Sequence, residues 1–434
     1  MSKKVLILTA IVLVFCACEL QADVIDSNWV GGSEEDTSWE RSSNWDPAIV
    51  PDNNATHTFA VTIDAGGGDV RVGLLQWHTI DQLDCYGYGE VELRSYTSGW
   101  IELTLVDPNG LTNHGYLVIE ELAIGGNVTN TTGATLELED MGIEGDLYNP
   151  AGATIEVFYE VWVDAVENAG SMMIAIAGKL DVEEGALHNT GQINIYGGAC
   201  TVYGNILDNN DTGLIKGFGV LYVDQLLRNK GQIYAYGGSL AISSEGPFLN
   251  SGILANYALS SLHIKPAADV NNNGTIEVNG GGGVAFDCNL VNEPNGVIKL
   301  LGGALAAATI TQTADANFAG FGSITGDVEI DANGVIQLSG PTNIVGDVEI
   351  DQNATLEISD GTTLVTGHCT CNNGTIHMKG GRLIPQGGFT NNGCNIIWEP
   401  GTYTNVADFN LDGLVNFKDF ADFADTWLWQ ATWY

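Results

Sequence analysis

One short motif recurs along most of this chain: an Asn-x-Gly turn followed by a strand in which apolar and polar residues alternate. The first turn of the series is Asn113-His114-Gly115 and the last is Asn392-Gly393, with neighbouring turns about 20 residues apart. A unit of this length cannot bury its own apolar face, whereas stacked units cover one another. The sequence therefore predicts a solenoid of stacked repeats.

Each unit carries two turns. Residues 192–196 (QINIY) alternate with the period of two that is typical of a β-strand. A glycine pair, such as Gly197-Gly198 or Gly302-Gly303, then marks a second turn, because glycine adopts positive φ without strain. Units built as strand, turn and strand predict an all-β fold, a parallel β-helix over residues 111–402. No strict six-residue period is present, which favours a right-handed coil, and we expect the Asn residues to stack as ladders at the corners.

Residues 1–22 have the pattern of an export signal. Lys3 and Lys4 precede a short apolar run, and cleavage after Ala22 is the preferred interpretation. A lipid anchor at Cys18 is the alternative. No later segment reaches the apolar length of a membrane-spanning helix. The sequence thus predicts a secreted or cell-surface protein with no membrane span.

The charge of the chain limits its partners. It has 54 acidic and 14 basic residues, a formal net charge of −40, together with 44% hydrophobic residues. Binding to nucleic acid needs clustered Lys and Arg, so this class of partner is excluded. The apolar content is too high for a disordered acidic tail and is sufficient for a core.

Residues 23–110 are predicted to form an N-terminal cap and the first coils. Trp29, Trp39 and Trp45 fall within a short stretch of this segment. Two interpretations compete: the tryptophans plug the open end of the solenoid, or they form an exposed platform for sugars. The stretch resembles the opening of many secreted bacterial β-helix proteins of the adhesin type.

The cysteines outside the export signal are scattered along the chain. The preferred interpretation combines buried core cysteines with a disulfide between Cys371 and Cys394, which an exported chain permits. The alternative is a metal cluster, although its spacing fits no familiar zinc pattern. That cluster would consist of His368, Cys369, Cys371, His377 and Cys394.

The most specific motif lies in residues 403–434. Oxygen ligands recur at alternate positions of a twelve-residue loop, with Gly413 at the sixth position, as a Ca²⁺ site requires. Position 12 holds an Asp in place of the usual Glu. The predicted calcium ligands are Asp408, Asn410, Asp412, Leu414 through its carbonyl, Asn416 and Asp419.

An apolar helical face formed by Phe420, Phe423 and Trp427 follows this loop. An EF-hand-like loop followed by one helix resembles half of a type I dockerin. The resemblance implies Ca²⁺ as a cofactor and a cohesin-like protein as a partner. Because a second half is absent, the segment has two interpretations: it caps the last coil, or it docks on a partner.

No catalytic motif stands out in the sequence. The main hypothesis is therefore a non-catalytic structural or interaction protein with a calcium-binding C-terminus. The alternative is a polysaccharide-binding or polysaccharide-degrading β-helix, a glycoside hydrolase or lyase, because this fold hosts such enzymes. Tyr196 and Tyr236 precede glycine pairs in matching strands, with Tyr203 and Tyr222 nearby. These tyrosines predict either a partial binding stripe or ordinary stacked side chains.

Overall fold

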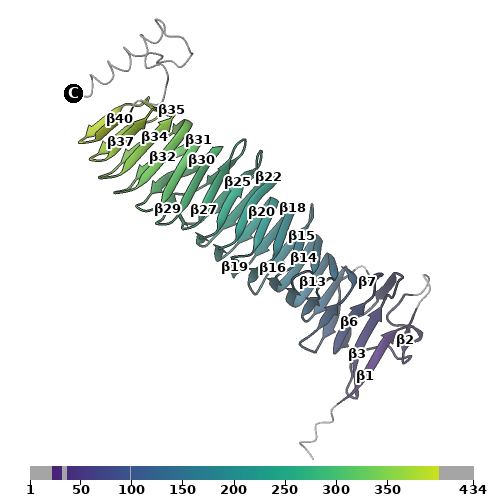
Figure 1. The fold of residues 1–434 in the computed structure, drawn as a ribbon. Helices are drawn as coiled ribbons and strands as arrows, with labels where there is room; N and C mark the ends of the chain where they lie inside the picture. The colour runs from purple at the N-terminus through teal and green to yellow at the C-terminus, as the bar shows by residue number, and fades with distance from the viewer. Residues whose placement is uncertain (1–21, 32–36, 98, 400–434) are drawn as a thin grey trace, which may run out of the picture. The chain divides into compact units, whose positions relative to one another are not determined.

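The computed structural model describes residues 22–31, 37–97 and 99–399. They form a parallel β-solenoid of about 17 turns, as predicted (Figure 1). The handedness of the coil stays a prediction. The chain divides into two compact units, residues 1–187 and residues 188–434, and each unit is described by itself. Within the described residues no helix is both long enough and apolar enough to cross a bilayer.

The described part of the first unit contains one short 3-10 helix, η1 (Ser42–Asn44), among its strands. Its strands are β1 (Asp23–Trp29), β2 (Trp45–Asp46), β3 (His57–Asp64), β4 (Val70–Leu74), β5 (His78–Ile80), β6 (Gln82–Tyr86), β7 (Glu90–Ser95), β8 (Ile101–Leu105), β9 (Leu111–Asn113), β10 (Tyr116–Glu120), β11 (Leu122–Gly125), β12 (Val128–Asn130), β13 (Thr135–Asn149), β14 (Thr154–Asn168), β15 (Ser171–Ile174) and β16 (Lys179–Val182). Strand β17 (Leu187–Asn189) begins at the last residue of this unit.

The described part of the second unit consists of strands and turns. Its strands are β18 (Gln192–Val202), β19 (Ile206–Asn209), β20 (Leu214–Val223), β21 (Leu226–Asn229), β22 (Gln232–Ser244), β23 (Phe248–Asn250), β24 (Ile253–Asn256), β25 (Ser261–Pro266), β26 (Val270–Asn272), β27 (Thr275–Asn279), β28 (Gly283–Phe286), β29 (Leu290–Asn292), β30 (Val297–Gln312), β31 (Asn317–Ile330), β32 (Val335–Val345), β33 (Val348–Ile350), β34 (Thr355–Asp360), β35 (Thr362–Val365), β36 (Cys369–Asn372), β37 (Thr375–Lys379), β38 (Arg382–Pro385), β39 (Phe389–Asn392) and β40 (Asn395–Glu399).

Parallel pairing places like residues above one another in both units. In the second unit Ile215 of β20 pairs with Ile233 of β22, and both side chains are fully buried. In the first unit Leu136 of β13 pairs in the same way with Ile155 of β14. Because side chains alternate between the two faces of a strand, each coil turns a row of Leu, Ile and Val inward. These rows form the core that a single coil could not bury alone.

Buried amide side chains form a ladder in each unit, which confirms the predicted stacking of Asn at corners. From Asn113 to Asn149 and from Asn189 to Asn292, each rung donates its side-chain amide to the side-chain oxygen of the rung on the next coil, at 2.6–3.1 Å. The rungs are Asn113, Asn130, Asn149 and Asn168 in the first unit, and Asn189, Asn209, Asn229, Asn250, Asn272, Asn292 and Gln312 in the second.

The ladder does not follow the predicted turns throughout. Past Gln312 the turn residues Asn333, Asn353 and Asn373 adopt positive φ and are not rungs. Asn272 and Asn292 are the rungs, whereas the turn residues Asn273 and Asn295 are not. Asn295 instead adopts a positive φ of 75°. The reason is that a rung must be the last inward residue of its strand, while the residues after it form the turn.

The N-terminal tryptophans are buried. Trp39 and Trp45 are 0% and 2% exposed, and their rings meet edge to face at 4.6 Å. Trp45 also contacts Trp29, and its indole N–H donates to the Trp39 carbonyl at 2.8 Å. Strand β2 pairs antiparallel with β1, the first strand of the stack, so this segment covers the N-terminal end of the coil. The tryptophans therefore pack as a plug and do not form a sugar platform.

Candidate functional site: an aromatic column

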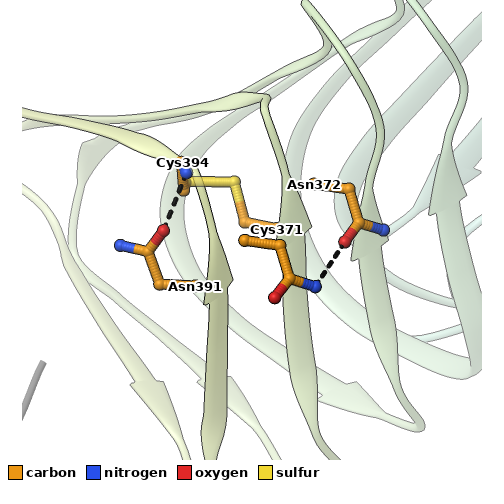
Figure 2. The surroundings of a disulfide bond; sticks show 5 residues. Cys371, Asn372, Asn391 and Cys394 are labelled. Atoms are coloured by element: carbon orange, nitrogen blue, oxygen red, sulfur yellow. Dashed lines mark hydrogen bonds between the residues drawn. A yellow bond between two sulfur atoms is a disulfide. The ribbon is translucent and has the colours of Figure 1, made fainter.

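The predicted calcium ligands Asp408 to Asp419 lie outside the described residues, so their geometry stays a prediction. Residues 22–31, 37–97 and 99–399 contain no group of three His, Cys, Asp or Glu side chains placed to hold a metal. The alternative metal cluster around Cys371 is wrong, because Cys371 and Cys394 form a disulfide with Cα atoms 5.4 Å apart (Figure 2). His368 of that cluster instead contacts the Thr390 hydroxyl at 2.7 Å.

Exposed aromatic and apolar side chains line up on successive coils of the second unit. Each occupies the last outward position before the corner, on the strand segment that follows the Asn-x-Gly turn or, for Tyr257, directly after that strand. We call this set the aromatic column; it consists of Tyr196, Phe218, Tyr236, Tyr257, Leu301 and Phe321, with Asn279 at the one polar position. The strands that carry it follow one another side by side in Figure 1, from β18 to β31.

Strand register brings these side chains together. Tyr196 of β18 pairs directly with Phe218 of β20, and Leu301 of β30 pairs with Phe321 of β31. The rings of Tyr236 and Tyr257 meet edge to face, with centroids 5.2 Å apart and planes at 86°. Adjacent members lie on neighbouring strands, so they are about 4.8 Å apart along the stack. The column is therefore one continuous surface feature rather than a set of scattered tyrosines.

The column residues are accessible to solvent. Exposed fractions are 39% for Tyr196, 52% for Tyr236, 49% for Tyr257 and 41% for Phe321. Side chains of this kind usually lie buried in a soluble protein, and contiguous exposed apolar surface marks an interaction site. The column thus presents exposed aromatic and apolar side chains in one row of the described structure.

Glycines lie at the corner that adjoins the column. Gly237, directly after Tyr236, has a φ of 79°, a conformation that other residues adopt only with strain. Phe218 lies over the next coil's glycine pair: a Cβ at Gly238 would stand 3.0 Å from the Cβ of Phe218. The glycine pair therefore makes room for the Phe218 ring to lie close to the backbone of the next coil.

The outward residues beside the column carry little negative charge. The column lies on β18, β20, β22, β24, β27, β30 and β31. Among the outward positions of these strands up to residue 321, Glu277 is the one carboxylate, and Nζ of Lys299 lies 3.5 Å from its Oε1. Lys216 lies in the same outward row as Glu277, three coils before it. This face is therefore nearly neutral in a chain whose formal charge is −40. A neutral face favours partners that are bound by stacking and hydrogen bonds over ionic ones.

The structure places two of the four predicted tyrosines in one row and adds further members, while a binding role for this row stays a prediction. Tyr196 and Tyr236 belong to the column. Tyr203 and Tyr222 form a separate pair with ring centroids 6.2 Å apart, on the strand segments after the corner. A simple sequence signal was available for the added members, because Phe218, Leu301 and Phe321 each precede a glycine, as Tyr196 and Tyr236 do.

A second unusual surface lies in the first unit, where glutamates gather on the strands that follow the turns. Glu120 of β10 pairs with Glu139 of β13, and Glu137 of β13 pairs with Glu156 of β14. Like charges in such direct register repel each other. The Tyr116 hydroxyl donates to Glu137 at 2.5 Å and relieves part of this repulsion.

Burial and the neighbouring carboxylates change the acidity of this group. Burial, followed by the hydrogen bond with Glu137 and its charge, raises the pKa of Glu139 to about 7. Burial and the charge of Glu137 also raise the pKa of Glu156. A carboxyl group that is still partly protonated near neutral pH can act as a general acid. Sequence analysis missed this group because acidic residues are so frequent in the chain that no pair stands out.

No family model, curated protein or solved structure matches this chain. Its function must therefore be argued from its own geometry.

Proposed function

We propose that this protein is an exported, non-catalytic β-solenoid that binds a polysaccharide along the aromatic column of its second unit. The single observation that carries the proposal is the alignment of Tyr196, Phe218, Tyr236 and Tyr257 on four successive coils, with the three tyrosine rings exposed and Phe218 half-buried. Aromatic faces stack on the C–H surface of sugar rings, and tyrosine hydroxyls add hydrogen bonds to sugar hydroxyls. A surface with this combination suits a carbohydrate better than a nucleic acid or a lipid.

Export is part of the proposal. The basic and apolar start of the chain supports it, and so does the disulfide between Cys371 and Cys394, a bond that persists in oxidising compartments. Polysaccharides are abundant at cell surfaces and outside cells. The proposed location and the proposed ligand therefore agree.

Residues 403–434 supply the second part of the proposal. We infer that Asp408, Asn410, Asp412 and Asp419 bind Ca²⁺ through side-chain oxygens, with Leu414 and Asn416 completing the loop. The helix predicted after the loop would then present its apolar face either to the last coil of the solenoid or to a cohesin-like partner. The exposed Trp398 of β40, 56% accessible, supports the first of these arrangements.

The test of the proposed function is retention of the full-length protein by polysaccharides. Affinity electrophoresis in gels that contain soluble glycans, with pull-down on insoluble ones, should retard or retain the native chain. Tyr236→Ala should weaken binding about 3- to 10-fold, because one aromatic contact contributes about 0.5–1.5 kcal/mol. Tyr203→Ala is the matched control, because Tyr203 is a similarly exposed tyrosine outside the column. Equal loss in both variants, or no retention by any glycan, would refute the proposal.

A polysaccharide hydrolase or lyase is the second candidate. The observation that favours it is the glutamate group of the first unit, where Glu137 and Glu139 share a hydrogen bond and Glu139 has a raised pKa. Glycoside hydrolysis uses one protonated and one ionised carboxyl group. Release of reducing ends by the purified protein, lost in Glu139→Gln, would support this candidate over a purely binding role.

A further inference from the structure

The direction and the length of the aromatic column restrict which polysaccharides it can hold. This inference rests on the proposed function and goes further, to the form of the ligand and the way it lies. The column has seven positions, from Tyr196 to Phe321, and adjacent positions are separated by one strand spacing of about 4.8 Å. Its total length is therefore about 29 Å, measured parallel to the stacking direction.

Across the column, in contrast, the surface is short. Each strand offers three outward positions before the corner, for example Gln232, Tyr234 and Tyr236 on β22. Tyr234 contributes to the same surface, because its ring lies 5.5 Å from that of Tyr257. Beyond the corner the chain turns away at Gly237, so a ligand that lay along a strand would soon lose contact.

We propose that the column binds an uncharged, extended polysaccharide that runs parallel to the solenoid stack, with about one sugar unit on each coil. A pyranose unit in an extended chain is about as long as the spacing between β-strands, so successive sugars stay in step with successive rings. The near-neutral face accepts an uncharged glycan, and the overall charge of −40 repels polyanionic ones.

Asn279 divides the binding surface into two parts. Four rings precede it, and Leu301 and Phe321 follow it. Asn279 is held by its neighbour, because its side-chain amide donates to the Asn256 carbonyl at 2.7 Å. A tetrasaccharide would cover only the first part, whereas a heptasaccharide would reach Phe321.

The experiment is a calorimetric titration of the full-length protein with a length series of neutral oligosaccharides, from two to ten units, of whichever glycan retains the protein. We expect affinity to rise beyond the tetrasaccharide and to level off near seven units. Phe321→Ala should weaken heptasaccharide binding several-fold while leaving tetrasaccharide binding unchanged, and Tyr196→Ala should weaken both. A merely structural role for these side chains would not produce this dependence on length.

Two outcomes would overturn the inference and leave the proposed function standing. The first is a plateau at two or three units, which would place the glycan across the strands. The second is a preference for anionic oligosaccharides over neutral ones. If Phe321→Ala lowers the melting temperature of the protein, Leu301→Ser replaces it, because Leu301 is 44% exposed and lies in the same part of the column. Absence of binding to every glycan would instead refute the proposed function itself.

Discussion

The side-chain amide of Asn229 donates a hydrogen bond to Oδ1 of Asn250 at 2.8 Å, one coil further along the second unit. The same amide donates to the Ile253 carbonyl at 3.1 Å, and Oδ1 of Asn229 accepts from Asn209. Asn229 is fully buried, and these hydrogen bonds satisfy both polar atoms of its side chain inside the protein. Such a rung fixes the register of the coils on both sides of it.

Replacing this rung should destabilise the second unit. Asn229→Leu removes the side-chain donor to Oδ1 of Asn250 and to the Ile253 carbonyl, and each buried orphan costs about 1–3 kcal/mol. The expected result is a lower denaturation midpoint in urea with little change in slope. An unchanged midpoint would show that the ladder contributes nothing to stability.

Gln312 provides the matched control, because it is the end of the ladder. The next residue in its column is Ile330, which offers no acceptor, and Nε2 of Gln312 is buried without a partner. Asn292 donates to Gln312 but also to the Asn317 carbonyl at 3.1 Å. Gln312→Leu should therefore change the free energy of unfolding by less than about 1 kcal/mol, well below the effect of Asn229→Leu.

The glutamate group of the first unit predicts a dependence of stability on pH. The folded-state pKa of Glu139 is about 7, above its ordinary value of 4.5, so the folded state binds more protons between these two values. The free energy of unfolding should therefore fall as the pH rises from 4.5 to 7 and flatten above 7. Urea titrations from pH 5 to pH 8, followed by tryptophan fluorescence, measure this slope.

Glu139→Gln should reduce that slope and stabilise the protein above pH 7, because it removes a charge next to Glu137 and Glu120. Glu329→Gln is a control on an exposed outward position of β31. If Glu139→Gln shows the same pH slope as the native protein, the pH dependence of stability does not come from the raised pKa of Glu139.

The disulfide between Cys371 and Cys394 links the last two described coils. At these coils the amide ladder has ended and other residues occupy its row. Past Gln312 the inward row of the ladder continues as Ile330, Ile350 and Cys371, so no buried amide pair joins the coils there. The amide of Asn392 donates to Oδ1 of Asn372 at 2.8 Å beside the disulfide, but this pair is exposed (Figure 2). Removing the disulfide with Cys371→Ser and Cys394→Ser should lower stability by about 3 kcal/mol, the usual effect for a loop of this size.

Trypsin gives a local measurement of this effect. Lys379 and Arg382 lie between the two cysteines, so the double variant should be cut there first, while the native protein resists. Cys288→Ser, which removes an unpaired thiol, should leave the digestion pattern unchanged. Equal resistance in all three proteins would show that the disulfide does not hold the last coils.

Calcium removal tests the proposed C-terminal loop. The full-length protein, stripped with EDTA, should bind one Ca²⁺ in a calorimetric titration and gain thermal stability when the ion is restored. Asp412→Ala should abolish this binding, because it removes a ligand from the loop. Asp211→Ala, at an exposed turn of the second unit, is the control and should bind as the native chain does. Normal binding by Asp412→Ala would place the ion elsewhere.

The sequence predicted the solenoid because its regularity is local: the turn, the alternation and the glycine pair all repeat within about 20 residues. Individual rungs were harder to predict, since Asn272 and Asn273 are adjacent and only the strand's end decides which one faces inward. The glutamate group could not be predicted. Glu137 and Glu156 lie side by side only because of the register of β13 and β14. The spacing of the repeats alone does not determine this register to within one residue.

The central claim is that a glycan lies on the aromatic column, and hydroxyl-radical footprinting tests it most directly. Saturation of the full-length protein with a neutral oligosaccharide of seven units should protect Tyr196, Tyr236 and Tyr257 from oxidation. Tyr203 and Tyr222 should react at the same rate with and without the sugar. Saturable binding that leaves the column tyrosines fully reactive would contradict the account.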